Sequence, residues 1–218
     1  MLSIVRNVSV SDSISKGSGL IPDMWRDRKT VFVDTLGWDV PVVGGAFEID
    51  QFDDEHAVYL VVSDRVRRRH LASLRLLPSA RPHILGDIFP GLCASPIPRG
   101  PSVWEITRLC ISPAIGAVRQ AMLVRRELAL GLLEYALAHG IAHYTQVHLA
   151  SHLPQLLAVG WNCTPLGFPA EHDGQILMAS RIAVSAAALD HVRATNGVRH
   201  AVSAAVRAGV GERAAMAA

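Results

Sequence analysis

Apolar positions along the chain change repeatedly between a period of two and a period near 3.6, which predicts strands interleaved with helices. Strands are expected at residues 3–10, 56–62, 70–77, 102–112, 142–149, 161–166 and 175–184, and helices at about 21–36, 119–138 and 151–159, with a short helical piece near 84–89. Residues 11–19, rich in Ser and Gly, are expected to form a polar loop. This order predicts an α/β fold with one mixed sheet and helices on its faces.

The length of the chain favours a single domain. Half of its 218 residues are hydrophobic, which is enough for one well-filled core. We expect this domain to span residues 1–184 and an Ala-rich helical extension or tail to occupy 185–218, with a break at Asn196-Gly197.

Composition narrows the class of protein. The formal net charge is only +2, so a nucleic-acid partner is not implied. The three cysteines, Cys93, Cys110 and Cys163, lie far apart without a CxxC motif, which is typical of free thiols in a reducing compartment. No secretory leader and no apolar run of about 18 residues is found. We therefore expect a cytoplasmic protein without a membrane span.

The segment after the first helix combines aromatic and acidic side chains. Phe32 lies on the apolar face of that helix and Trp38 follows Gly37, where the helix is expected to end. Glu48, Asp50 and Asp53 come next. Carboxylates this close raise one another's pKa or need cations, which favours a binding site. For the segment taken alone, a solvated loop is about as good an interpretation.

Three charged residues interrupt apolar strands: Arg75, Glu105 and Arg108. An unpaired charge buried in such a strand costs on the order of several kcal/mol, so each of these side chains needs a partner. Glu105 and Arg108 are three apart and would point to opposite faces of a straight strand unless a bulge redirects one. Two interpretations stay open: structural ion pairs, or an arginine that grips a ligand carboxylate beside a glutamate that accepts a proton.

A histidine-rich run raises the question of a metal. The pairs His139/His143 and His148/His152 are four apart, a spacing that chelates a metal on a helix. Gly140 interrupts the first pair, and the second spans a predicted strand-to-helix junction. No metal site is therefore expected.

Taken together, the charged and aromatic residues resemble the LuxI-type acyl-homoserine-lactone synthases. The resemblance rests on R-x-x-x-F-x-x-x-x-x-W (Arg28, Phe32, Trp38), E-x-D-x-F-D (Glu48, Asp50, Asp53), LRLLP (Arg75) and W-E-x-x-R (Glu105, Arg108). It covers residues 24–112 and continues more weakly to about 184. It implies a GNAT-like three-layer sandwich whose mixed central sheet is split in a V.

The resemblance also implies a reaction. S-adenosylmethionine is the amine substrate, and a fatty acyl thioester of acyl carrier protein or coenzyme A is the donor, with no prosthetic group. It implies Glu105 and Asp50 as catalytic groups, and Arg108, Phe32 and Trp38 as S-adenosylmethionine-binding residues. The residues Arg28, Glu48, Asp53 and Arg75 would form the supporting ion-pair network.

The acyl group is less well defined. Its pocket is expected near 142–149, where Thr145, Gln146 or His148 contacts the chain. Arg119, Arg125 and Arg126 at the start of the long helix are either docking charges for an acidic acyl carrier protein or a solvated helix end. Chain length, donor type and oligomeric state are left open.

Two other functions compete with this interpretation. A GNAT-like N-acyltransferase that uses a different amine would share the sheet, but it leaves Phe32, Trp38 and Asp50 without a role. A non-enzymatic regulator is not supported by any helix-turn-helix signal or basic stripe.

Overall fold

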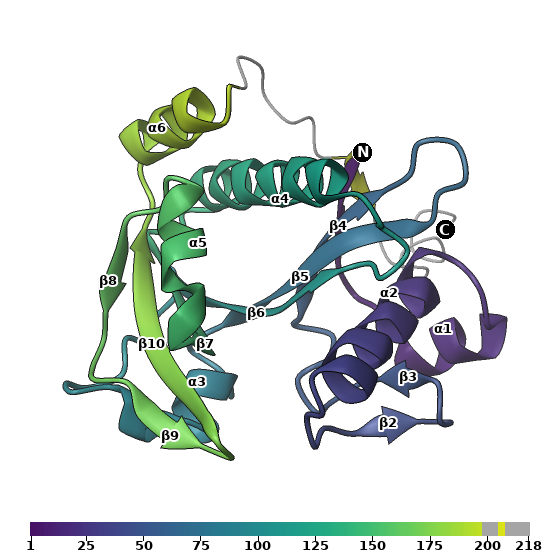
Figure 1. The fold of residues 1–218 in the computed structure, drawn as a ribbon, viewed down its shortest axis with the longest axis horizontal. Helices are drawn as coiled ribbons and strands as arrows, with labels where there is room; N and C mark the ends of the chain where they lie inside the picture. The colour runs from purple at the N-terminus through teal and green to yellow at the C-terminus, as the bar shows by residue number, and fades with distance from the viewer. Residues whose placement is uncertain (198–204, 208–218) are drawn as a thin grey trace, which may run out of the picture. The chain divides into compact units, whose positions relative to one another are not determined.

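The computed structural model describes residues 1–197 and 205–207, and Figure 1 shows its helices and strands. The chain forms two compact units. Of the described residues, the first unit contains 1–75, 108–128 and 205–207, and the second contains 76–107 and 129–197. The strands β5 (His70–Pro78) and β6 (Val103–Ile111) pass from one unit into the other, so each contributes residues to both.

The first unit carries the N-terminal helices and one end of the sheet. Its elements are β1 (Leu2–Val5), α1 (Val10–Lys16), α2 (Leu20–Arg28), the π-helix η1 (Lys29–Thr35), β2 (Val42–Val43), β3 (Phe47–Glu48), β4 (Val58–Ser63), the first part of β5, the last part of β6, the start of α4 (Val118–Ala138) and β11 (Ala205–Arg207). β1 pairs antiparallel with β4 and parallel with β11. β2 and β3 form a separate two-stranded ribbon.

The second unit carries the other end of the sheet. Its elements are the end of β5, α3 (Ile84–Asp87), the 3-10 turn η2 (Pro90–Leu92), the start of β6, the end of α4, β7 (His143–Leu149), η3 (Ala150–His152), α5 (Leu153–Ala158), β8 (Cys163–Pro165), β9 (Ala170–His172), β10 (Gln175–Ala183) and α6 (Ala186–Asn196). β6 and β7 run parallel and pair over Val103–Ile106 and His143–Gln146. β10 is antiparallel to β7, β8 and β9.

The predicted α/β fold with a mixed sheet is confirmed. The hairpin at 56–77, the strand at 102–112 and the long helix at 119–138 lie within a few residues of β4–β5, β6 and α4. The predicted helical break at Asn196-Gly197 also holds, because Gly197 ends α6 with a left-handed backbone, φ +66°. The remainder of the predicted tail lies outside the described residues except for β11.

The polar loop predicted at 11–19 is wrong, because α1 occupies most of it. Ser9 caps the helix by accepting a hydrogen bond from the N–H of Asp12, and Gly17 ends it in the left-handed region, φ +61°. The same two residue types that suggested a loop are therefore the two caps of a short helix. The first strand is correspondingly shorter than predicted and ends at Val5.

The end of the first long helix is a π-helix, which the 3.6-residue period did not predict. Its side chains follow a five-residue spacing: Lys29 binds Asp34 at 2.7 Å, and the Thr35 hydroxyl donates to the Thr30 carbonyl at 2.9 Å. Gly37 then adopts φ +68° and turns the chain, so that the N–H of Trp38 reaches the carbonyl of Phe32 at 2.8 Å. This wide turn brings two aromatic residues of the sequence motif together.

The core positions of the long helix were predicted only in part. Leu128, Leu132, Leu133 and Ala136 are buried, but Met122, Leu123 and Leu137 are 42–49% exposed. None of the helices in residues 1–197 is long and apolar enough to cross a membrane.

Candidate active site

Six charged side chains of the first unit form a closed ring in which carboxylates and guanidinium groups alternate. The nearest N–O distances around the ring are 2.5 Å for Arg28–Glu48, 3.0 Å for Glu48–Arg108, 2.6 Å for Arg108–Asp50, 2.6 Å for Asp50–Arg75, 2.9 Å for Arg75–Asp53 and 2.8 Å for Asp53–Arg28. The residues come from α2, β3, the loop after β3, β5 and β6. The ring thus ties together segments that are up to 80 residues apart in the sequence, a separation given by Arg28 and Arg108.

The ring favours the ionised form of two of its carboxylates, Asp50 and Asp53. Burial alone would raise the pKa of Asp53, but the guanidinium groups of Arg28 and Arg75 hold it far below its usual value. Burial likewise opposes ionisation of Asp50, and Arg75 and Arg108 hold its pKa below normal. The ring contains three positive and three negative charges, so the cluster buries no net charge and each ion has a partner that offsets its desolvation cost.

Tyr59 is a member of this cluster that sequence reasoning missed. Its hydroxyl donates to Asp53 at 2.7 Å, and Asp53 also accepts the backbone N–H of Asp50 at 2.9 Å. Burial, followed by the negative charge of Asp53, raises the pKa of Tyr59. The only signal in the sequence is one hydroxyl-bearing residue within the apolar run 57–62.

Arg108 occupies the most accessible position of the ring. Its backbone has φ +49°, in the left-handed region that β-strand residues other than Gly rarely adopt. Glu105 and Arg108 are three residues apart, and in a regular strand they would point to opposite faces. Because the backbone at Arg108 is irregular, this rule does not fix the direction of the Arg108 side chain. The side chain, 10% exposed, donates from Nε to Glu48 and from Nη2 to Asp50. Its third nitrogen, Nη1, makes no hydrogen bond within the described part of the chain.

The electrostatic environment of Arg108 favours another anion. Burial lowers its pKa, and the neighbouring cations Arg75 and Arg28 add to this effect against the attraction of Glu48 and Asp50. A ligand carboxylate at Nη1 would relieve that unfavourable balance through a charge-assisted hydrogen bond.

Two aromatic rings continue outward from Arg108. The Arg108 guanidinium carbon lies 5.7 Å from the centre of the Phe32 ring, within the range of a cation–π contact. Phe32 stacks on Trp38 with ring centres 4.8 Å apart and planes 7° apart. Phe32 is buried and Trp38 is half-buried. The first unit therefore presents one accessible indole beside a cation with a spare donor.

Glu105 has a different environment, in the second unit. Its two carboxylate oxygens accept the backbone N–H groups of Ile84 and Leu85, each at 2.7 Å, and the side chain is fully buried. Glu105 thus holds the start of α3 against β6. Of the nine residues in the sequence motifs, eight lie in the first unit: six form the charge ring and two form the aromatic pair.

The three residues proposed for the acyl pocket lie on β7. Ser180 of β10, which sequence reasoning missed, accepts from the Gln146 amide at 3.0 Å and lies 3.1 Å from His148 Nε2. His148 Nδ1 is 2.9 Å from the Leu149 carbonyl, which can only accept, so Nδ1 carries the proton and Nε2 accepts from Ser180. Burial lowers the pKa of His148. Thr145 is fully buried, and its hydroxyl has no hydrogen-bond partner in residues 1–197.

The described residues contain one group of metal-ligating types with close ligand atoms, Asp54, Glu55 and His56. Asp54 already accepts the backbone N–H groups of His56 and Ala57, and Glu55 is exposed. The histidine pairs considered from the sequence do not form such a group.

Comparison with known proteins identifies the family. The sequence profile described as "Autoinducer synthase" matches residues 13–192. An acyl-homoserine-lactone synthase of Rhizobium etli is 34% identical over 161 residues, which cover 73% of this chain and 75% of the relative.

Solved structures agree in fold. The CoA-dependent acyl-homoserine lactone synthase MesI superposes with a TM-score of 0.76 at 26% identity and covers 93% of this chain and 98% of that one. A second CoA-dependent enzyme, BjaI, solved with SAM and isopentyl-CoA, gives 0.79 at 24% identity and covers 95% and 92%. The fold is therefore GNAT-like, as the resemblance implied. The chain belongs to the autoinducer synthase family, which includes the acyl-homoserine-lactone synthases.

Proposed function

We propose that this protein transfers an acyl group from a thioester to the amine of S-adenosylmethionine, closes the lactone and releases methylthioadenosine. The observation that carries this proposal is the arrangement around Arg108. The Arg108 guanidinium, whose Nη1 is unused, lies 5.7 Å from the centre of the Phe32 ring, and the indole of Trp38 stacks on the same ring at 4.8 Å. S-adenosylmethionine offers the matching groups: a carboxylate, a sulfonium and a flat purine.

Each group of the substrate has a chemical counterpart in the first unit. Arg108 Nη1 donates to the methionyl carboxylate, and Trp38 contributes an aromatic face for the sulfonium or the purine. Asp50 remains anionic because Arg75 and Arg108 lower its pKa, so it contributes negative charge near the sulfonium. Arg28, Glu48, Asp53 and Arg75 hold Arg108 and Asp50 in place.

The acylation step needs the free amine. An α-amino group has a pKa of about 7.7–8.0, so only a modest proton acceptor is required near neutral pH. We assign this role to Glu105, directly or through a water, with Asp50 contributing negative charge. The amine nitrogen attacks the thioester carbonyl, the C–N bond forms, and the thiol leaves with a proton.

Lactone formation follows within the same molecule. One oxygen of the methionyl carboxylate attacks the γ-carbon, and the bond to sulfur breaks, so the sulfonium departs as neutral methylthioadenosine. Both reacting groups belong to one molecule, so the closure needs no further collision, and holding the carboxylate near the γ-carbon favours it. When the lactone closes, the carboxylate loses its negative charge. Its hydrogen bond to Arg108 Nη1 is then no longer charge-assisted on the ligand side, so Arg108 releases the product.

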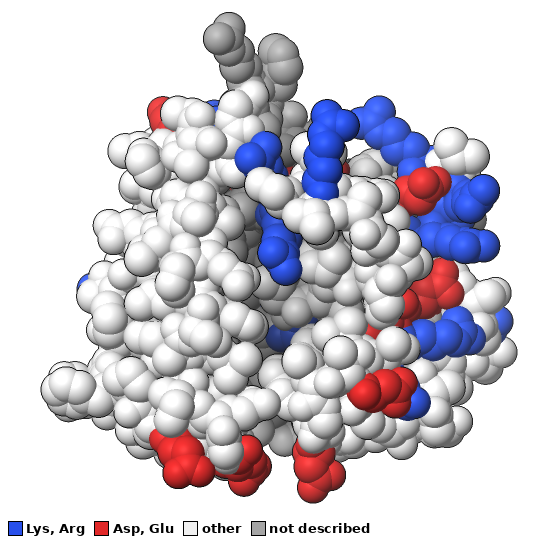
Figure 2. Space-filling model, viewed as in Figure 1, with Lys and Arg blue, Asp and Glu red and all other residues white. Residues whose placement is uncertain are grey.

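Acyl-CoA and acyl-carrier protein are both compatible donors. MesI and BjaI are CoA-dependent, which supports coenzyme A. Exposed arginines support an acidic carrier protein: Figure 2 shows basic side chains gathered over the β4–β5 hairpin, and Arg119 and Arg125 of α4 are exposed in the same unit. The Gln146–Ser180–His148 cluster is our assignment for the polar part of the acyl pocket.

The direct test of the reaction uses the purified full-length chain. With S-adenosylmethionine and a panel of acyl-CoA and acyl-carrier-protein thioesters, we expect acyl-homoserine lactone and methylthioadenosine in equal amounts by mass spectrometry. Acylation of another amine without methylthioadenosine would instead identify a GNAT-like N-acyltransferase and refute the proposal.

Arg108→Ala is expected to raise the KM for S-adenosylmethionine about 10- to 100-fold, the equivalent of one charge-assisted hydrogen bond, with a smaller effect on the KM for the thioester. Steady-state kinetics that vary each substrate in turn measure this difference. Arg81→Ala, which removes an exposed arginine of the second unit with no assigned role, is the matched control and should leave both values unchanged. Equal effects on both substrates would assign Arg108 to structure alone.

Glu105→Gln is expected to reduce both stability and turnover. A glutamine amide nitrogen cannot accept the second N–H of α3, so the free energy of unfolding should fall by about 1–3 kcal/mol. Under conditions where the variant is folded by circular dichroism, kcat should still fall at least about tenfold near neutral pH and should recover in part above about pH 8, where the amine loses its proton without help from a base. Glu171→Gln, at an exposed position of the same unit, controls for the lost charge. A normal kcat in the folded variant would show that Glu105 supports α3 but does not act as the base.

Asp53→Asn tests the ring. Because the pKa of Asp53 is lowered in the folded state, its contribution to stability is present above about pH 4 and is lost as the pH falls below that value. The variant should be less stable by about 3–5 kcal/mol at pH 7 and should lose less stability on acidification, measured by urea unfolding from pH 7 to pH 3. Asp34→Asn, which breaks an exposed pair with Lys29, should cost less than about 1 kcal/mol. Equal costs for the two variants would contradict a stabilising ring.

A further inference from the structure

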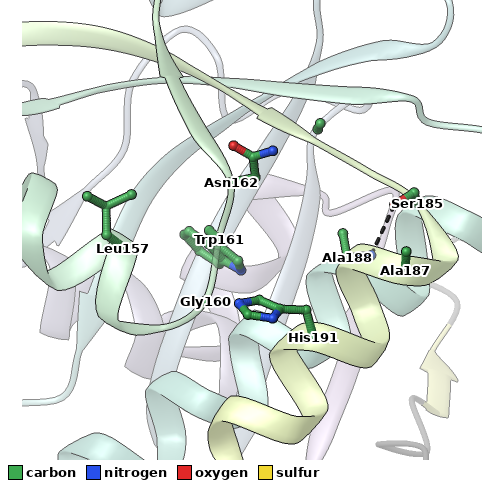
Figure 3. A pocket seen from close by; sticks show the side chains of 9 residues that line it. Leu157, Gly160, Trp161, Asn162, Ser185, Ala187, Ala188 and His191 are labelled. Carbon is green, nitrogen blue, oxygen red and sulfur yellow. Dashed lines mark hydrogen bonds between the residues drawn. The ribbon is translucent and has the colours of Figure 1, made fainter.

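A cavity opens in the second unit, and none of the residues assigned to the reaction lines it. Its volume is about 460 Å³, within the usual range of small-molecule sites. Figure 3 shows the side chains of the lining residues, which come from α5, the turn after α5, the end of β10 and the start of α6: Leu157, Gly160, Trp161, Asn162, Ala183, Ser185, Ala187, Ala188 and His191.

Trp161 supplies a buried donor without an acceptor. Its side chain is 7% exposed, and its indole nitrogen Nε1 has no hydrogen-bond partner within the described residues. Figure 3 shows that nitrogen on the side of the ring nearer to His191, another residue that lines the cavity. An unsatisfied buried donor costs about 1–3 kcal/mol, and an indole N–H can only donate. A ligand that accepts a hydrogen bond here would recover this cost.

The start of α6 adds donors to the same cavity. Ser185 caps the helix and accepts the N–H groups of Ala188 at 3.0 Å and Leu189 at 3.1 Å. The first-turn N–H groups of Ala186 and Ala187 have no acceptor within the helix, and Ala187 lines the cavity. Because the N-terminal end of a helix is electropositive, it favours the oxygen end of a dipole.

The other lining groups favour an uncharged ligand. None of the nine lining residues is Asp, Glu, Lys or Arg, so the cavity offers no permanently charged side chain as a counterion. Most of the rest of the lining is aliphatic, formed by Leu157 and three alanines. The ligand that fits is a neutral molecule with at least one carbonyl acceptor and an aliphatic chain.

We propose that this cavity is a binding site for N-acyl amides and esters of that kind, and specifically for the acyl-homoserine lactone that the enzyme itself makes. Its amide and lactone carbonyls accept from Trp161 Nε1 and the start of α6, and its acyl chain lies along Leu157 and the alanines. The identity of the ligand rests on the proposed function. The cavity and its unsatisfied donor are observed independently of the proposed function.

The indole N–H signals of the four tryptophans separate the two sites in one experiment. In the full-length chain labelled with 15N-tryptophan, each signal is assigned by a Trp→Phe substitution. Titration with N-hexanoyl-homoserine lactone should move the Trp161 signal saturably downfield as its hydrogen bond forms. S-adenosylmethionine should move the Trp38 signal. Hexanamide, with the same carbonyl chemistry, should act weakly at Trp161, whereas hexanoate should not.

Two variants keep the test independent of Trp161 itself. Ala187→Glu places a carboxylate at the start of α6 and should weaken lactone binding at least about tenfold, measured by calorimetry with methylthioadenosine present to occupy the proposed catalytic site. Ala194→Glu, at an exposed position of α6 outside the cavity, is the matched control and should bind as the parent protein does. Trp161→Phe should weaken binding as well, and Trp25→Phe, which removes a buried indole in the other unit, should not.

The outcomes distinguish the proposals. A lactone that moves only the Trp38 signal, or none, overturns the second site. A shift at Trp161 without any effect of S-adenosylmethionine at Trp38 supports the second site and overturns the proposed substrate site. Preference for hexanoate over the lactone would show a carboxylate site and would also overturn the proposed ligand class.

Discussion

The closed ring of six alternating charges is the constraint on which the first unit depends. Each carboxylate forms ion pairs with two guanidinium groups. Neutralising any one member therefore leaves a buried partner with an uncompensated charge. The ring joins α2, β3 and two sheet strands, and it therefore determines where the side chain of Arg108 must lie. That requirement accounts for the left-handed backbone of Arg108, which a regular strand would not adopt.

The ring also separates structural from chemical roles among similar residues. Arg28 and Arg75 are fully buried, and carboxylates raise their pKa values despite burial. Arg108 has the opposite shift, because burial and two neighbouring guanidinium groups outweigh its two carboxylates. Of the three arginines, Arg108 is the one beside the aromatic pair, and its Nη1 makes no hydrogen bond within the described residues.

The sequence alone predicted which buried charges need partners better than it predicted their geometry. Charged residues inside apolar strands identified Arg75, Glu105 and Arg108, because burial forces such residues to have partners. The π-helix that brings Phe32 to Trp38 could not be predicted, since it depends on a five-residue spacing and on Gly37 rather than on hydrophobic period. Tyr59 and Ser180 were missed because their partners come from distant segments, and a single hydroxyl in an apolar strand gives no periodic signal.

Unsatisfied polar groups complement the ring as indicators of function. The ring shows polar groups that the fold satisfies internally, whereas the Thr145 hydroxyl and the Trp161 indole are buried donors without a partner among the described residues. The indole of Trp25 is equally unsatisfied there, but it is packed in the core of the first unit and does not line the cavity at Trp161. An unpaired donor therefore indicates a ligand only where space, a second source of donors and a lining of matching polarity occur together, as they do at Trp161.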